Sequence, residues 1–263
     1  MEHKLFAVYG NSGSYKTTTA VNLVTLLSRY YSDASVALVS VDDTKPILPL
    51  VLPHRDCSTS LGSLMGSIEE LDETQMLVNA ESVGSNIAVY GYNKGENINS
   101  YPMTADPKID DFYMHLRNDY EFTVIDCTSS LMGSKYTAKA IIHADKVLQL
   151  ISCDVFGLSF YDSQYALLQR AQYGYDRKFI KCLSLPGEYT PDTTEMKRIT
   201  NSTCIIPHSK SATIAINSGQ AFGAINDKVY RHALRSIIEI LTDEAQLEPD
   251  NEELHINADT FRK

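Results

Sequence analysis

The sequence predicts an α/β fold: a single domain with a mostly parallel, twisted sheet flanked by helices. Short apolar runs alternate with amphipathic patterns of helical period from near the first residue to about residue 242, which is typical of a parallel sheet covered by helices. The 263 residues are 43% hydrophobic and 21% charged, enough apolar material for one sizeable core. Division into two small domains is the alternative. We expect one domain over residues 1–242, followed by a frayed acidic tail over residues 243–263.

Each expected element follows from its local pattern. Continuous apolar runs of strand length, of the kind buried on both faces of a sheet, predict strands at residues 5–9, 36–41, 86–90, 122–125, 146–152, 178–183 and 203–206. Amphipathic stretches predict helices at residues 16–31, 109–119, 156–173 and 227–241, with short helices between residues 61 and 82. Asn, Gly and Pro residues after the strand at 86–90 predict a polar loop that extends to about residue 107.

Composition restricts the compartment and the partners. No run of about 18 apolar residues is present, and the first residues lead directly into a strand-like segment, so we expect a cytoplasmic protein. The net charge of −10 argues against generic binding to nucleic acid or anionic lipid; direct DNA binding through a local basic patch stays open as an alternative. Single cysteines without a CxxC pair predict ordinary buried thiols: Cys57, Cys127, Cys153, Cys182 and Cys204.

The strongest local motif lies between the first expected strand and the helix that follows it. In a phosphate-binding loop of this kind, successive backbone N–H groups and the positive end of a helix point at phosphate oxygens. Lys16 would then reach the β- and γ-phosphates, and the Thr17 hydroxyl would ligate Mg²⁺. The residues expected to hold the phosphates of ATP are Gly10, Asn11, Ser12, Gly13, Ser14, Tyr15, Lys16, Thr17 and Thr18.

The motif departs from the GxxxxGK[ST] pattern at one position. Tyr15 stands where the second glycine is expected, and a side chain at a position suited to positive φ costs about 1 kcal/mol or more. The loop must therefore carry strain or adopt another shape. The alternative interpretation is a Gly/Ser turn with a solvated Lys16.

Carboxylates stand at the C-terminal ends of two of the expected strands. Asp126 ends the strand at 122–125, where it would reach the magnesium through a water and sense the γ-phosphate; a routine helix cap is the alternative. Asp42 and Asp43 close the strand at 36–41, at the sheet edge where ligands bind. Either could orient an attacking water or touch the metal shell, and turn formation is the alternative.

These segments together resemble the ParA/MinD family of dimerising ATPases, a branch of the P-loop NTPase fold. The resemblance extends over most of the chain to about residue 242 and rests on four stretches: residues 16–23, 36–42, 119–126, and 206–208 with 217–219. It implies ATP and Mg²⁺ as ligands, with Lys16, Asp42 and Asp126 as catalytic residues, and Thr17, Asp42 and Asp126 around the metal. It also places Pro207 near the adenine and implies a homodimer that works with a protein cargo or adaptor. Residues 60–126 look most like the CpaE/TadZ branch.

Departures from the family pattern limit what carries over. Asn11 occupies the position of a signature lysine that reaches across the dimer, so neutralisation of phosphate charge by the partner copy would be lost. No asparagine stands in the strand around residues 179–185, where the family often reads adenine. The tail over residues 244–259 is acidic rather than a basic amphipathic helix, so we expect no direct membrane anchor. We expect no receiver-like domain of the kind found in many CpaE/TadZ proteins.

Three hypotheses follow. The first is a slow ATPase whose nucleotide-dependent dimerisation positions or partitions a cargo, such as a plasmid complex or a pilus or secretion machinery. The second is a catalytically impaired scaffold that acts as a localisation or assembly module, favoured by Asn11 and Tyr15. The third, a small-molecule kinase, lacks the cluster of arginines that a phosphate-clamping lid needs.

Overall fold

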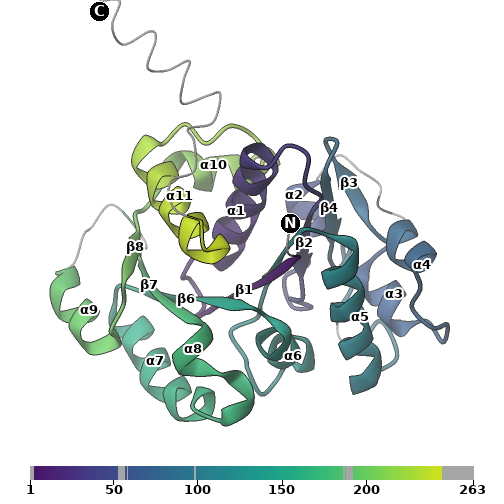
Figure 1. The fold of residues 1–263 in the computed structure, drawn as a ribbon, viewed down its shortest axis with the longest axis horizontal. Coiled ribbons are helices and arrows are strands. Elements are labelled where there is room, and N and C mark those ends of the chain that lie inside the picture. The colour runs from purple at the N-terminus through teal and green to yellow at the C-terminus, as the bar shows by residue number, and fades with distance from the viewer. Residues whose placement is uncertain are drawn as a thin grey trace, which may run out of the picture.

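The described residues form one eight-stranded sheet with helices on both faces (Figure 1). This computed structural model describes residues 3–52, 57, 59–97, 99–185, 187 and 192–244. The strand order is β3-β4-β2-β5-β1-β6-β7-β8. All neighbours are parallel except β3, which runs antiparallel to β4 at one edge. The predicted fold class, a mostly parallel sheet between helices, is confirmed.

The strands have the lengths that their apolar runs predict. They are β1 (Lys4–Gly10), β2 (Val36–Ser40), β3 (Glu81–Val83), β4 (Ile87–Tyr90), β5 (Phe122–Asp126), β6 (Lys146–Ser152), β7 (Phe179–Ser184) and β8 (Cys204–Ile206). The central strands β1, β2, β5 and β6 are buried along nearly their whole length. Burial on both faces explains why these strands read as continuous rather than alternating apolar runs.

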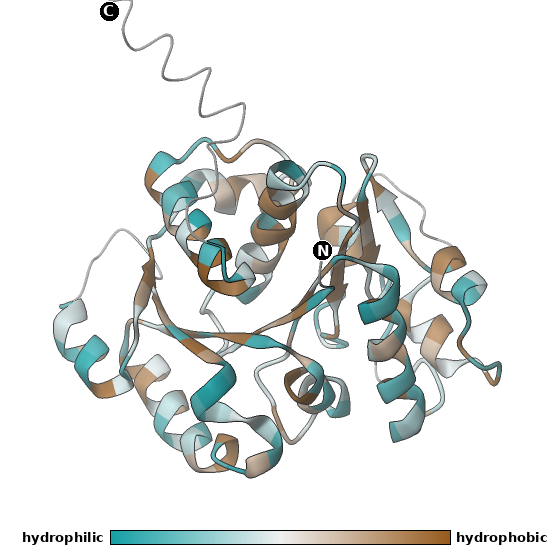
Figure 2. Cartoon of the chain, viewed as in Figure 1, coloured by the Kyte–Doolittle hydropathy of each residue, from teal (hydrophilic) through white to brown (hydrophobic). Residues whose placement is uncertain are grey.

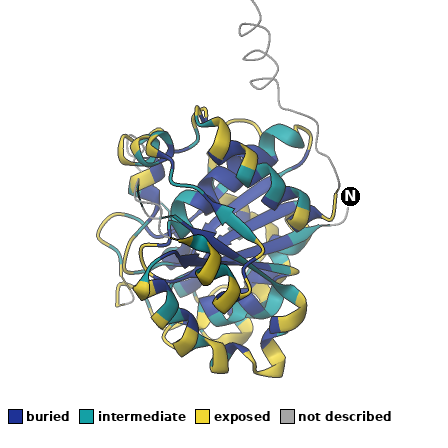
Figure 3. Cartoon of the chain, turned by 90° about the vertical axis from the view of Figure 1, so that its left-hand side faces the viewer, coloured by how far each residue is buried: buried dark blue, intermediate teal, exposed yellow. Residues whose placement is uncertain are grey.

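The helices lie in two layers, one on each face of the sheet (Figures 1 and 2). They are α1 (Lys16–Tyr30), α2 (Leu48–Val51), α3 (Leu61–Gly66), α4 (Glu73–Val78), α5 (Asp106–Asp119), α6 (Lys135–His143), α7 (Val155–Leu168), α8 (Tyr175–Lys178), α9 (Thr193–Thr200), α10 (Lys210–Asn217) and α11 (Lys228–Thr242). One core packs α1, α2, α10 and α11 on the sheet, and a second packs α3, α4, α5, α6 and α8 on the other face. Figure 3 shows the sheet as the buried centre between partly exposed helices.

Several elements differ from the sequence-based expectation. The helix predicted over residues 156–173 is wrong at its end: α7 stops at Leu168, Arg170 is extended, and a 3-10 turn follows over Ala171–Tyr173. Gly174 at φ 58° then reverses the chain so that Tyr173 and Tyr175 both enter the core. The sequence also left α2, α6, α8, α9, α10 and the edge strand β3 unpredicted.

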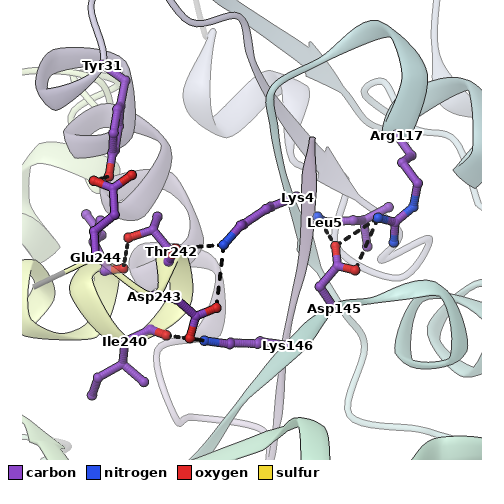
Figure 4. Close-up of polar contacts among 11 residues, drawn as sticks. Lys4, Leu5, Tyr31, Arg117, Asp145, Lys146, Ile240, Thr242, Asp243 and Glu244 are labelled. Carbon is purple, nitrogen blue, oxygen red and sulfur yellow. Dashed lines mark hydrogen bonds and ion pairs between the residues drawn. The ribbon is translucent and has the colours of Figure 1, made fainter. Parts of the chain in front are cut away.

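The C-terminal end of α11 is held at the amino ends of β1 and β6, whereas the predicted loop motif follows the carboxyl end of β1 (Figure 4). Lys4 Nζ donates to the Thr242 carbonyl at 2.6 Å, and Lys146 Nζ donates to the Ile240 carbonyl and to Asp243. Cations at a helix C-terminus satisfy its free carbonyls and oppose its dipole. The predicted tail over 243–263 lies outside the described residues from residue 245 onward.

Two expectations drawn from composition can be compared with the structure. Of the cysteines, four are buried and Cys204 is partly buried, all as free thiols, which confirms the expected packing role for four of the five. Within the described ranges, no helix combines the length and the apolar character needed to cross a bilayer.

Candidate functional site

Polar residues gather at the carboxyl ends of five neighbouring strands. Ser40 and Val8 both lie opposite Asp126 in the sheet register, and Ser152 lies opposite Ser184. Asn11 follows β1 directly between these pairs. Carboxyl ends of parallel strands form the edge where α/β proteins bind ligands. The sequence-predicted loop therefore opens on the edge of the sheet that can hold a ligand.

The loop over residues 10–17 is curled between β1 and α1. A Cβ at Gly10 would lie 2.0 Å from the Leu150 carbonyl oxygen, so only glycine fits where β1 passes β6. Gly13 has φ 83°, and Ser14 Oγ donates to the Asn11 carbonyl at 2.8 Å. Tyr15 adopts φ 60° and ψ 30° directly before the helix. Tyr15 therefore takes the left-handed conformation that its position demands, at the expected cost in strain.

Lys16 folds back across the loop. Its Nζ donates to the Asn11 carbonyl at 3.0 Å and to Ser129 Oγ at 2.8 Å. Burial lowers the pKa of Lys16, while the charges of Asp126 and Asp42 act in the opposite direction. The ammonium thus joins the loop to the segment that follows β5. A phosphate group would bind the ammonium more strongly than either neutral oxygen does. Hydrogen bonds are stronger when both partners are charged.

Asp126 stands at the centre of the site and is 2% exposed. Its Oδ2 accepts from Thr17 Oγ1 at 2.7 Å and from Ser40 Oγ at 3.2 Å. Its Oδ1 is buried, and no hydrogen-bond partner for it lies among the described residues. Burial raises the pKa of Asp126 to about 6, with Thr17, Lys16 and Ser40 lowering it in part.

These oxygens fit a hydrated magnesium ion. Mg²⁺ prefers oxygen ligands, keeps several waters, and is commonly held by one or two protein oxygens together with substrate phosphates. The Thr17 hydroxyl and the unpartnered Asp126 oxygen supply such a donor set beside the loop. The residues present therefore fit the metal that the sequence predicts.

Asp42 and Asp43 occupy different environments. Asp42 Oδ1 accepts from Thr44 N at 2.9 Å and from Lys45 N at 3.1 Å, which is the turn-forming role named as the alternative. Burial first, and then the Asp42 charge, raises the pKa of Asp43. Asp43 lines a separate hollow of about 570 Å³. Asp42 is thus the member of the pair whose charge acts on Lys16 and Asp126.

Asn11 is held by the fold rather than presented to solvent. It is 4% exposed; its Nδ2 donates to Ser152 Oγ at 2.8 Å, and its Oδ1 accepts from Ser152 N at 2.9 Å. Ser152 Oγ in turn donates to Asp154 at 2.8 Å. The side chain at the family's signature-lysine position therefore connects the loop to the end of β6.

The Tyr15 ring lies beside the loop, against the segment after β8. It meets the His208 ring at 5.8 Å between centroids with an angle of 64°. Tyr15, Thr18 and His208 line a cavity of about 10 Å³ together with Pro207. Pro207, the residue expected near a base, is thus brought next to the loop residues.

Sequence reasoning gave no site role to four serines at this edge. Ser40 and Ser129 bond Asp126 and Lys16, Ser152 fixes Asn11, and Ser184 ends β7 beside the Tyr15 cavity. Each follows an apolar run or lies just beyond one, which is the signal that identified Asp126. Serine is so common in turns that this signal did not single them out.

The fold and the loop define a P-loop NTPase-type architecture, and solved structures share it. A ParA family ATPase from Chlorobium tepidum is similar over 90% of this chain and 98% of its own, with TM-score 0.75 and 14% identity. MinD from Pyrococcus horikoshii in complex with Mg-ADP matches 91% of this chain and 96% of its own, with TM-score 0.71 and 16% identity. The ATP complex of a McdA variant from Cyanothece matches 95% of this chain and 100% of its own, with TM-score 0.67 and 15% identity.

The likeness to these ParA/MinD-type ATPases is one of fold. No protein-family model matches the sequence, and no curated protein sequence matches it. At 14 to 16% identity the fold extends over nearly the whole length of each neighbour. The resemblance stated from the sequence is confirmed at that level.

Proposed function

We propose that this chain binds Mg-ATP in the loop over residues 10–17 and acts as a slow, cytoplasmic ATPase of ParA/MinD type. The observation that carries the proposal is the pair of contacts from the loop to the end of β5: Lys16 to Ser129 and Thr17 to Asp126. The Mg-ADP and ATP found in two of its structural neighbours support this choice of ligand.

Each site residue has a role in that proposal. The loop amides and Lys16 hold the β- and γ-phosphates, and Lys16 stabilises their charge. Thr17 and Asp126 would hold the metal, which would neutralise phosphate charge when bound. Asp42 orients the attacking water with Oδ2, because the hydrogen bonds of its turn go to Oδ1.

The segment after β5 transmits the nucleotide state. Lys16 now donates to Ser129 Oγ, and a γ-phosphate would compete for the same ammonium. Release of Ser129 would change the position of its side chain on the wall of an open hollow of about 430 Å³, which Ser129 lines with Ser12 and Phe160. Nucleotide binding therefore changes the surface beside the loop.

That surface is the proposed dimer face. Met132 lines this hollow and is 64% exposed, and Val155 and Phe156, at the start of the helix α7 that contributes Phe160, are 74% and 77% exposed. Exposed apolar side chains gathered beside a ligand site are typical of an interaction surface. A second copy of this chain would cover them, and the dimer would then engage a protein cargo or adaptor, such as a plasmid complex or the base of a pilus or secretion machinery, without a direct membrane anchor.

Light scattering with a slowly hydrolysed ATP analogue tests the proposal. The mass should rise from 29.3 kDa toward twice that value when Mg²⁺ and the analogue are added together. Phe156→Asp should block the increase, and Val229→Asp, equally exposed on α11, should leave it intact. An unchanged wild-type mass would contradict the dimerisation switch.

The impaired scaffold remains a second candidate because Asn11 cannot reach a partner copy. Its side chain is buried and bonded to Ser152. ATP turnover separates the two functions. Phosphate release that Lys16→Ala abolishes supports the slow ATPase, whereas binding of Mg-ATP without any release supports the scaffold.

A further inference from the structure

An open hollow of about 570 Å³ lies between the segments that follow β2, β4 and β5. Asp43 lines it after β2, Tyr92 after β4 and Met132 after β5. Helix α3 contributes Gly62 and Met65 to a further side. Small-molecule sites span roughly 300–1,000 Å³, so the hollow has the size of such a site. The residues that hold phosphate or metal in the proposed function do not line it.

Thioether and aromatic side chains make up much of the wall. They are Met65, Met103, Met132, Tyr92, Tyr101 and Tyr136. Methionine is unbranched and polarizable and adapts to the shape of its neighbours, and a tyrosine ring attracts both apolar groups and cations to its face. The walls therefore suit a ligand with an apolar body.

The Tyr101 ring is held against the backbone of α3. A Cβ at Gly62 would lie 2.4 Å from this ring, and a Cβ at Gly66 would lie 2.9 Å from the Tyr101 Cβ. The two glycines are one helical turn apart and so share a face of α3, and their lack of side chains lets the tyrosine approach. The Tyr101 hydroxyl donates to Glu96 at 2.6 Å. This part of the wall is thus positioned by the fold itself.

Among the residues that the structure describes, two charged side chains line the hollow, Asp43 and Lys135. Lys135 Nζ is paired with Asp106 at 2.7 Å, whereas no cation in the described ranges pairs with Asp43. Burial raises the pKa of the Tyr92 and Tyr136 hydroxyls, and the Asp43 charge acts in the same direction. The Asp43 carboxylate therefore lies near these two hydroxyls, and its negative charge is available to a ligand.

We infer that this hollow binds a small organic amine, with the ammonium group on the Asp43 carboxylate and the apolar body among the methionine and tyrosine side chains. A carboxylate partly withdrawn from water attracts a cation more strongly than a fully solvated one does. Tyrosine faces add attraction for the same cation. An anionic ligand of similar shape would be repelled by Asp43. The inference is independent of the proposed nucleotide binding.

Calorimetric titration of the full-length chain with phenylbutylamine tests the inference, in EDTA and without nucleotide so that no metal competes for Asp43. Phenylbutanol is the neutral analogue of nearly the same shape, and phenylbutyrate is the anionic one. The wild type should bind the amine saturably and about tenfold or more tighter than the alcohol, the value of a hydrogen bond to a charged group. It should bind phenylbutyrate more weakly than either.

Two variants separate the charge from the wall. Asp43→Asn should weaken the amine about ten- to a hundredfold and leave the alcohol unchanged, and Asp33→Asn on the exposed surface controls for the loss of one carboxylate. Tyr101→Leu should weaken the amine and the alcohol together, because both lose the ring. Equal wild-type affinities for amine and alcohol, or an amine affinity that Asp43→Asn leaves intact, would overturn the site. Failure of the wild type to bind the amine would overturn it too, and the proposed Mg-ATP binding would stand.

Discussion

Replacement of Asp126 by asparagine should make the metal-free protein more stable at neutral pH. Burial holds the pKa of Asp126 at about 6, above its ordinary value of 3.8. The native state therefore binds this proton more tightly than the unfolded state does. The stability that the group contributes is complete below about pH 4 and is lost as the pH rises through 6.

The magnitude follows from the size of the shift. A rise from 3.8 to about 6 is roughly two pH units, and at about 1.4 kcal/mol each this corresponds to ~3 kcal/mol. Asparagine keeps the oxygen that accepts from Thr17 and Ser40, but its NH₂ group takes the place of the unpartnered Oδ1, which costs about 1–2 kcal/mol at every pH. Because part of this change already occurs below pH 4, the gain of Asp126→Asn over the wild type should grow by about 2.4 kcal/mol between pH 4 and pH 7.5.

Urea unfolding in EDTA at pH 4, 5, 6 and 7.5 measures this difference, with Asp33→Asn on the exposed surface as a control for the loss of one charge. EDTA is essential because a bound metal would reverse the preference for the neutral form. A difference between Asp126→Asn and wild type that stays constant, or that shrinks toward pH 7.5, would refute the assignment of a buried carboxylate with a raised pKa.

Three further changes test other parts of the structure, each by urea unfolding at pH 7.5. Gly10→Ala places a Cβ 2.0 Å from a backbone oxygen and should cost more than about 3 kcal/mol, whereas Gly13→Ala, with open space around it, should cost only about 1. Asn11→Ala should cost about 2 kcal/mol, because Ser152 N loses its buried acceptor; equal stability would mean that the connection is dispensable. Lys4→Met should cost about 1 kcal/mol, since the Thr242 carbonyl loses its cap, and an effect that grows with added salt would contradict this cause.

The long elements of the fold could be predicted because their patterns are strong. Strands such as β1 and β6 are buried on both faces and read as unbroken apolar runs. Among the helices that were missed, α2 and α8 have four residues each, and α6, α9 and α10 have eight or nine, too few for a clear period. Their N-cap residues Ser134, Asp192 and Ser209 were visible signals that went unused.

The sequence predicted the site residues that carry a charge or must be glycine. It did not predict the directions in which the side chains point. Thr17 contacts Asp126, and Lys16 reaches Ser129 in the segment just after it. The direction of a side chain cannot be read from a motif: Asn11 turns toward Ser152, and the Tyr15 ring turns toward His208. Both outcomes depend on residues more than 140 positions away, which no local pattern contains.

Calorimetric titration of Mg-ATP into the wild type, Lys16→Ala and Lys94→Ala tests the phosphate-binding loop most directly. Lys94 is exposed and lies in the loop after β4, so its variant controls for the loss of a lysine. We predict saturable binding by the wild type and Lys94→Ala and no measurable binding by Lys16→Ala. Indistinguishable affinities for wild type and Lys16→Ala would show that ATP is held elsewhere or not at all.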